Sequence, residues 1–232
     1  MIRTFFRFAV ALVGLVVVVI LAYQGYVLAR IWWWTDHNPQ STAFMQARLE
    51  VMREKSLNAQ LKHQWIAYEK VSVHLKRAIL VSEDDKFVDH EGFDWESIQK
   101  AREKNQQKGK VVAGGSTISQ QLAKNLFLSG ERSMLRKAEE AVITLMLEWM
   151  MDKERILEIY LNVIEWGDGV FGAEAAAKHY FGVSAAQLSA EQAAKLAAMV
   201  PRPRFYDRNR NAPWLLKKTQ IILERMPRAQ LP

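Results

Sequence analysis

The longest apolar run lies near the start of the sequence, and the pattern changes after it. Residues 8–29 are 22 positions without a formal charge, mostly Val, Leu, Ile and Ala. At ~1.5 Å per residue, a helix of this length spans about 33 Å, which matches a hydrocarbon layer of ~30 Å. The run therefore predicts one membrane-spanning helix at residues 8–31, after a short tail at residues 1–7.

The residues that flank this run predict its orientation. Arg3 and Arg7 precede it, and three consecutive tryptophans at 32–34 follow it as an interfacial belt. The positive-inside rule then places the N-terminus in the cytoplasm and the rest of the chain outside the cytoplasmic membrane. A cleaved signal peptide is the alternative, but its apolar core is usually shorter, and Trp-Trp-Trp is a poor start for a mature chain.

Beyond the anchor, apolar residues recur mainly with helical spacing. Ile118, Leu122 and Leu126 are four residues apart and form the stripe of one predicted helix. Further helices are predicted at residues 43–61, 73–81, 135–151, 153–163, 173–181, 190–200 and 214–225, with a mobile loop at 103–115. The centre of 135–151 is apolar nearly all round, which predicts a buried core helix. Strand-like runs are few, so the fold class is mainly α.

Composition and charge narrow the class of protein. The 232 residues suit the anchor, a juxtamembrane linker and helix at 32–60, and one globular domain at 61–232. Cysteine is absent, which excludes a disulfide framework, a thiolate metal site and a cysteine nucleophile. Residues 100–137 hold nine basic and two acidic residues, which accounts for the whole net charge of +7. This block suggests phosphate, anionic lipid or nucleic acid as a partner, or simply a solvated loop.

An acidic cluster follows the predicted helix at 73–81. Glu83 comes directly after an apolar run, where partial withdrawal from water raises the pKa of a carboxylate toward that of a general base. Asp84, Asp85 and His90 are near enough in sequence to orient it. A capping and salt-bridge cluster is the alternative.

A glycine pair opens the helix that carries Ile118. Gly114, Gly115, Ser116 and Thr117 suit a helix N-terminus, where free backbone N–H groups favour an anion, and Lys124 adds a positive charge two turns on. The spacing of a P-loop is missing, so nucleotide hydrolysis is not expected. A plain capped helix is the alternative.

A third candidate group for the chemistry consists of Arg136 and Glu140. Glu140 follows Arg136 by one helical turn, and an ordinary ion pair at that spacing is the default interpretation. The histidines show no metal-ligand spacing.

Together these pieces resemble the glycosyltransferase domain of peptidoglycan polymerases (glycosyltransferase family 51), which bifunctional penicillin-binding proteins share. The resemblance rests on E-D-x-x-F-x-x-H-x-G at Glu83–Gly92, G-G-S-T-I-x-Q-Q-x-x-K-N at Gly114–Asn125, R-K-x-x-E at Arg136–Glu140, I-L-E-x-Y-L-N at Ile156–Asn162 and the prolines that end Leu188–Pro203. No motif position departs from the pattern. Because no transpeptidase domain is attached, the chain resembles the monofunctional members of Gram-negative bacteria.

The resemblance implies a lysozyme-like domain with a head lobe and a membrane-dipping jaw near residues 126–135. Exposed apolar side chains are expected there at Leu126, Phe127, Leu128 and Met134. The resemblance also implies the site residues. Expected in catalysis are Glu83 and Glu140; expected in substrate binding are Asp84, Phe87, His90, Ser116, Thr117, Gln121, Lys124, Asn125, Arg136 and Lys137.

The implied reaction is polymerisation of lipid II, with inversion at C1 of MurNAc and release of undecaprenyl diphosphate. A divalent cation (Mg²⁺ or Mn²⁺) and no organic cofactor are expected. The expected partners are lipid II, the growing lipid-linked glycan, membrane lipid and cell-wall synthesis or division proteins, but no nucleic acid. Two alternatives stay open: a glycan-cleaving, lysozyme-like enzyme, and a non-catalytic membrane-anchored scaffold.

Overall fold

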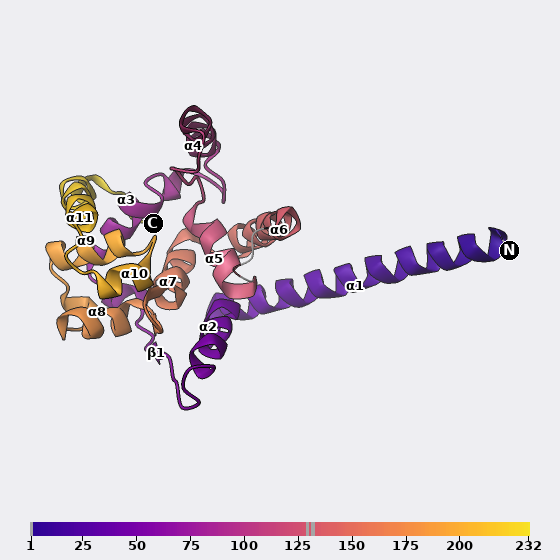
Figure 1. The fold of residues 1–232 in the computed structure, drawn as a ribbon, viewed down its shortest axis with the longest axis horizontal. Helices are drawn as coiled ribbons and strands as arrows, with labels where there is room; N and C mark the ends of the chain where they lie inside the picture. Colours follow the sequence, from indigo (N-terminus) through magenta and orange to yellow (C-terminus); the bar gives the residue numbers. More distant parts are fainter. Residues whose placement is uncertain (1, 129, 131–132) are drawn as a thin grey trace. The chain divides into compact units, whose positions relative to one another are not determined.

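The computed structural model describes residues 2–128, 130 and 133–232, which form two units. The first unit ends at Asn38 and consists of helix α1 (Ile2–Asp36). Within it, Phe5–Asp36 is long and apolar enough to cross a membrane, in agreement with the hydrophobic run. The second unit, Pro39–Pro232, holds every other element (Figure 1).

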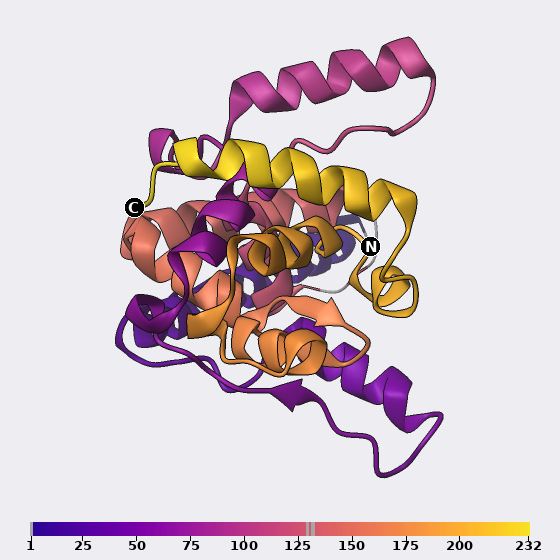
Figure 2. The same ribbon diagram turned by 90° about the vertical axis from the view of Figure 1, so that its left-hand side faces the viewer.

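The second unit is mainly α, as predicted (Figures 1 and 2). Its helices are α2 (Ala43–Arg53), α3 (Val73–Glu83), α4 (Trp95–Lys108), α5 (Ile118–Phe127), α6 (Met134–Met150), α7 (Lys153–Val163), α8 (Ala173–Phe181), α9 (Ala190–Met199), α10 (Pro203–Arg208) and α11 (Pro213–Arg225), with 3-10 turns at Tyr68–Lys70, Phe87–Asp89, Ala185–Gln187 and Met226–Arg228. Three short strands, β1 (Lys62–His63), β2 (Glu165–Gly167) and β3 (Val170–Phe171), form a sheet in the order β1-β3-β2. Strand β3 is parallel to β1 and antiparallel to β2.

The core is built where α5 packs on α6 and α7, and where α3 and α11 pack on α9. Ile79, Leu122, Ile159 and Leu196 contribute fully buried side chains from α3, α5, α7 and α9. Burying such side chains stabilises the fold by about 1.5–3 kcal/mol each. The two helices that carry the acidic and glycine motifs, α3 and α5, are therefore each held by a buried apolar face.

Helix α4 (Trp95–Lys108) is not among the helices predicted from the sequence. The loop expected at 103–115 is helical up to Lys108, so the prediction is wrong for its first half. Glu, Lys and Gln at 103–108 are good helix formers, and Gly109 ends the helix with a positive φ of 60°. Of the fourteen residues of α4, all of them described, only Ala101 is buried. The helix lies outside the main helical body in both views (Figures 1 and 2).

Two other helices differ from expectation. Helix α2 ends at Arg53 rather than near residue 61, and Leu57 beyond it is exposed. Helix α6 is not the fully buried core helix that its composition predicts. Val142, Leu145 and Trp149 are exposed, because α6 lies at the surface and buries only the face that contacts α5. An apolar helix surface of this kind cannot be told from a core face by composition alone.

The membrane-dipping jaw was expected to expose Leu126, Leu128 and Met134. Leu126 and Leu128 are instead buried, so that part of the expectation is wrong, whereas Met134 and Leu135 are exposed. The apolar stripe of α5 carries Leu126 into the core. Residues 129, 131 and 132, which complete the expected jaw and part of the basic block, lie outside the described residues.

Candidate active site

Glu83 is the last residue of α3, and three neighbours hold its carboxylate. Ser82 Oγ donates to Oε1 at 2.9 Å, and Gln121 Nε2 donates to Oε2 at 3.2 Å. The Lys218 ammonium nitrogen lies 3.7 Å from Oε1. The Tyr160 hydroxyl donates to Gln121 Oε1 at 3.0 Å, which leaves the amide nitrogen of Gln121 directed at the carboxylate.

The surroundings of this carboxylate change its basicity. Burial raises the pKa of Glu83, and the Lys218 charge and the hydrogen bonds from Gln121 and Ser82 oppose part of that rise. Burial also lowers the pKa of Lys218. A carboxylate whose pKa lies above its ordinary range is a stronger base than an exposed one. This is the property that a general base acting on a sugar hydroxyl requires.

The N-terminus of α5 is already occupied by a carboxylate of the chain. Ile118 N–H donates to Asp84 Oδ2 at 2.9 Å, and His90 Nε2 lies 3.0 Å from Oδ1. The backbone N–H of Gln120 donates to Thr117 Oγ1 at 3.2 Å. The expectation that free backbone N–H groups at this helix start bind a substrate anion is therefore wrong for these two amides. Asp84, which directly follows α3 and contacts His90, therefore connects the end of α3 to the start of α5.

Three other predicted binding residues occupy different surroundings. Phe87 is 1 % exposed and has the Lys153 ammonium 4.6 Å from its ring centre. The Thr117 hydroxyl donates to the Gly92 carbonyl at 2.7 Å and is buried. Ser116 alone among the three is exposed. The contacts of Phe87 and Thr117 favour roles in positioning the acidic motif.

Three cations gather around Glu140. Arg136 Nη1 donates to Glu140 Oε2 at 2.7 Å, and the Lys137 ammonium pairs with Oε1. The Glu140 side chain is only 4 % exposed, so this is not the ordinary surface pair that the spacing favours. Burial lowers the pKa of Lys124, on which Glu140, Arg136, Lys137 and Glu83 all act electrostatically. The predicted acid and the predicted cations therefore lie around one site.

Glu83 lines one cavity, and its hydrogen-bond partner Gln121 lines another. One, of about 190 Å³, is lined by Glu83 itself together with Ser82, Ser116, Arg225 and the glycine turn. The other, of about 200 Å³, is lined by Gln121, which donates to Glu83. Other residues around the second cavity are Phe44, Lys124, Asn125, Glu165, Pro201 and Arg204. The base therefore faces the first cavity, and its hydrogen bond with Gln121 joins it to the wall of the second.

The described side chains of the site provide few free ligands for a metal ion. Both oxygens of Glu140 are taken by Arg136 and Lys137. No group of three His, Asp or Glu side chains is arranged to hold a metal within the described part of the chain. The residues present therefore do not form a cage for a resident divalent cation, and no chemical step below depends on one.

Sequence reasoning missed two contributors to this site. Lys218 lies on α11 between Leu215 and Ile222, which are both buried, so it falls on the inward face of an amphipathic helix. A lysine in an apolar stripe is a readable signal of a partner. Tyr160 belongs to a quoted motif, but nothing in its spacing points to Gln121.

Comparisons with known proteins agree with the geometry. The sequence profile of a family described as Transglycosylase matches residues 50–227. A protein of Nitrosospira multiformis named biosynthetic peptidoglycan transglycosylase is 63% identical over 216 residues, which cover 93% of this chain and 94% of the relative. Proteins with the same name from Dechloromonas aromatica (64% over 221 residues, 95% and 94% coverage) and Chromobacterium violaceum (57% over 230 residues, 99% of each) match similarly.

Proposed function

Because the chain belongs to the transglycosylase family and is a peptidoglycan glycosyltransferase that polymerises glycan chains in cell-wall synthesis, we propose that Glu83 is its general base and lipid II its substrate. The observation that carries the proposal is that Glu83 lines one cavity, is hydrogen-bonded to Gln121 in the wall of a second, and acts electrostatically on Lys124, one of the cations near Glu140. This membership also disfavours the two alternatives, a glycan-cleaving enzyme and a non-catalytic scaffold.

The bond changes follow from this arrangement. Glu83 takes the proton of the 4-hydroxyl of the acceptor GlcNAc, and that oxygen forms a bond to C1 of the donor MurNAc. The bond from C1 to the diphosphate oxygen breaks, and undecaprenyl diphosphate leaves with the electron pair. Attack from the face opposite to the leaving group inverts C1.

The leaving diphosphate needs charge stabilisation more than it needs a proton. Lys124, Arg136 and Lys137 supply three positive charges, and Glu140 holds the last two in place. Donors that are already in position when charge develops lower the barrier most, because they need no reorganisation. Glu140 therefore acts in this proposal by organising cations and not as a second base.

The remaining predicted residues divide into two groups. Gln121 and Asn125 line the cavity of about 200 Å³ with Lys124, where they suit oxygens of the donor sugar. The exposed Ser116 suits the acceptor on the other side of Glu83.

Four of the predicted residues position other groups of the site and do not contact the substrate in this proposal. Asp84, Phe87, His90 and Thr117 hold the acidic motif against α5 by the hydrogen bonds and packing described above. They are positioning residues in this proposal.

The apolar helix α1 suits a single-pass anchor in the bacterial inner membrane, with a cytoplasmic N-terminus and a periplasmic catalytic domain. This location would bring the site to its lipid-linked substrate and growing chain. Cell-wall synthesis or division proteins remain expected partners, and Mg²⁺ or Mn²⁺ an expected cation that would accompany the diphosphate.

Purified protein incubated with fluorescent lipid II tests the proposed reaction. We expect a ladder of lengthening glycans on a gel, with β-1,4 linkages. A parallel reaction with a chelator measures the need for a divalent cation. Release of muropeptides from sacculi, without a ladder from lipid II, would contradict the proposal.

Lys218 offers a test through pH. Its charge lowers the pKa of Glu83, so Lys218→Met should raise that pKa further. Because the base works only when ionised, the acidic limb of kcat/KM should move to higher pH, and activity lost near neutral pH should return in more alkaline buffer. The exposed neighbour Lys217 gives the matched control Lys217→Met, which should keep the wild-type profile. An unshifted limb in Lys218→Met would remove Lys218 from this role.

A further inference from the structure

Arg204 lines the cavity of about 200 Å³ together with Gln121, Lys124 and Asn125, but no step of the proposed reaction uses it. It is the second residue of α10 and directly follows Pro203, which also lines this cavity. The Arg204 side chain is 52% exposed, whereas Lys124 is half-buried. Arg204 therefore stands at the solvent side of a cavity whose inner cation is Lys124.

The charges around Arg204 do not cancel. Arg204 Nε lies 3.4 Å from Glu165 Oε2, and Arg48 Nε lies 3.4 Å from Glu165 Oε1. Arg48 and Arg208 also pair with Asp168. Three arginines thus face two acids, which leaves one positive charge. The Glu165 side chain is only 5% exposed, so an anion that arrives from solvent meets the Arg204 guanidinium and not this carboxylate.

The Arg204 guanidinium can bind a ligand while it keeps its contact with Glu165. Among the described residues, Glu165 is the one acid that pairs with Arg204, and it faces Nε at a distance longer than a normal hydrogen bond. The terminal nitrogens carry further N–H donors. Such a guanidinium binds a planar carboxylate with two parallel hydrogen bonds.

A side cavity of about 160 Å³ adjoins Arg204. It shares Phe44, Glu165 and Arg204 with the cavity that contains Gln121. Ala47 and Val51 of helix α2 add apolar surface to its wall. A flexible group that leaves the cavity of Gln121 past Arg204 can therefore lie along α2.

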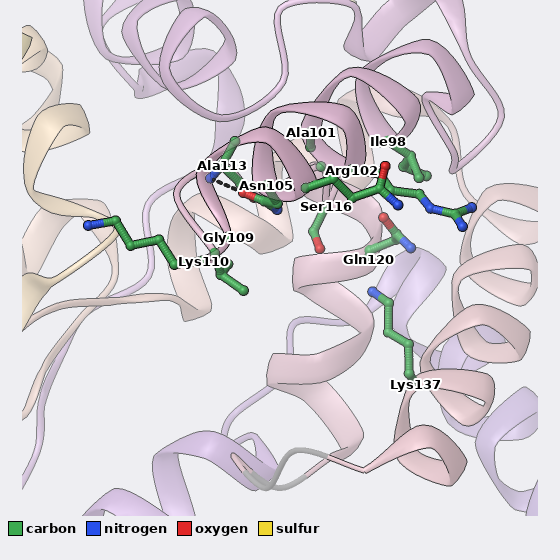
Figure 3. Close-up of a pocket in the computed structure, with 13 residues that line it drawn as sticks. Ile98, Ala101, Arg102, Asn105, Gly109, Lys110, Ala113, Ser116, Gln120 and Lys137 are labelled. Carbon is green, nitrogen blue, oxygen red and sulfur yellow. Dashed lines mark hydrogen bonds between the residues drawn. The ribbon is translucent and has the colours of Figure 1, made fainter.

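The larger cationic cavity of the protein lies on the other side of the site. It has a volume of about 650 Å³ between α4 and the glycine turn, and Arg102 is among its lining residues (Figure 3). It shares Gly115 and Ser116 with the cavity that contains Glu83. Among the described residues, it shares none with the cavity of Gln121. Its cations therefore do not take the place of Arg204.

The donor sugar of the reaction carries a suitable anion. The MurNAc of lipid II bears a short peptide on the lactyl group at C3, and this peptide has free carboxylates and the methyl groups of alanines. When the diphosphate at C1 lies at Lys124, the sugar ring fills the small cavity, and the peptide has to leave it on the solvent side.

We propose that Arg204 binds a carboxylate of the stem peptide of the donor, and that the peptide continues along the side cavity against Ala47 and Val51. Arg204 is then a specificity-determining residue for the donor. Glu165, held by Arg48, keeps the guanidinium in place. This inference rests on the proposed function, because it takes the cavity of Gln121 and Lys124 as the donor site.

Two donors that compete for the same enzyme test this role. Both are lipid II with the terminal 4-hydroxyl capped by galactose, so neither can act as an acceptor. One keeps its peptide carboxylates, and the other has each of them converted to a primary amide. They are mixed at equal concentration with labelled lipid II as the acceptor, and mass spectrometry counts the labelled, galactose-capped products. The product ratio equals the ratio of the two kcat/KM values, whatever fraction of a variant is folded.

Wild-type protein should favour the carboxylate donor by about fivefold, as expected for a half-exposed ion pair, and the preference should shrink at high salt. Arg204→Gln should bring the ratio close to one. Arg204→Lys keeps the charge without the paired hydrogen bonds and should fall between. Arg202→Gln is the matched control, because Arg202 is exposed two residues away and lines neither cavity. It should keep the wild-type ratio.

Two results would overturn the inference. A wild-type ratio near one would show that the protein does not recognise the charge of the peptide. A preference that survives Arg204→Gln would assign the carboxylate to another cation. If the rates with both donors then fall together, Arg204 serves the diphosphate or the packing of Glu165 instead. Failure of the proposed function looks different, since wild-type protein would then give no galactose-capped product from either donor.

Discussion

Glu83→Gln is expected to lower the rate of glycan polymerisation by roughly 10²–10⁴-fold, the usual contribution of a general base. The amide keeps the shape of the carboxylate and can still accept the hydrogen bond from Gln121, but it cannot take the proton of the acceptor hydroxyl. The measurement is the initial rate of consumption of fluorescent lipid II at equal protein concentration.

Two controls accompany this experiment: the Tm of Glu83→Gln, and the activity of a variant at the neighbouring acid Asp85. Burial raises the pKa of Glu83, which means that its ionised form destabilises the folded state at neutral pH. Neutral Gln removes that cost, so the Tm should not fall. Asp85, whose side chain is 51% exposed and paired with Arg225, gives the control Asp85→Asn, which should stay active. Near-normal turnover by Glu83→Gln would exclude Glu83 as the base.

Lys124→Ala is expected to lower kcat by about 10²–10³-fold, the loss typical of removing one positioned group that stabilises developing negative charge. Both Glu83 and Glu140 act electrostatically on Lys124, so this cation is close enough to sense the base and the acid that pairs with Arg136 and Lys137. Without it, charge on the departing diphosphate is less well balanced when the bond to C1 breaks. Single-turnover transfer from a lipid-linked donor, whose terminal 4-hydroxyl is capped so that it cannot act as an acceptor, measures this step.

The same variant distinguishes chemistry from folding. Burial lowers the pKa of Lys124, so its ammonium form costs stability at neutral pH, and its removal should leave the Tm nearly unchanged. Its ammonium lies 5.8 Å from the ring centre of Phe44, which is a loose contact. Lys108→Ala removes an exposed lysine at the end of α4 as a control. A large drop in Tm with normal activity per folded molecule would favour a structural role for Lys124.

The helices predicted at 153–163, 173–181 and 190–200 agree closely with α7, α8 and α9, and local capping chemistry explains why. Asp152 caps α7, and Ser189 with Gln192 forms the capping box that begins α9. Gly182 ends α8 with a φ of 70°. These features depend on a few neighbouring residues and hydrogen bonds within one turn, so they can be read from the chain.

Burial was harder to predict than helix position. The apolar α6 exposes Trp149, and the polar segment at 103–108 continues α4 instead of forming a loop. Both errors have one cause: hydrophobic pattern reports what a helix could bury, whereas its neighbours decide what it does bury.

The sequence by itself determined the membrane-spanning run, the mainly helical class and the set of acid, amide and cation that the chemistry uses, because each depends on composition or short spacing. Only the tertiary structure decided how these groups meet. It brought Lys218 from α11 to Glu83 on α3, placed the Asp84 carboxylate at the start of α5, and opened a cationic cavity beside Arg102. Such contacts join residues far apart in the chain, and the packing of whole helices, which no local pattern records, sets their distances.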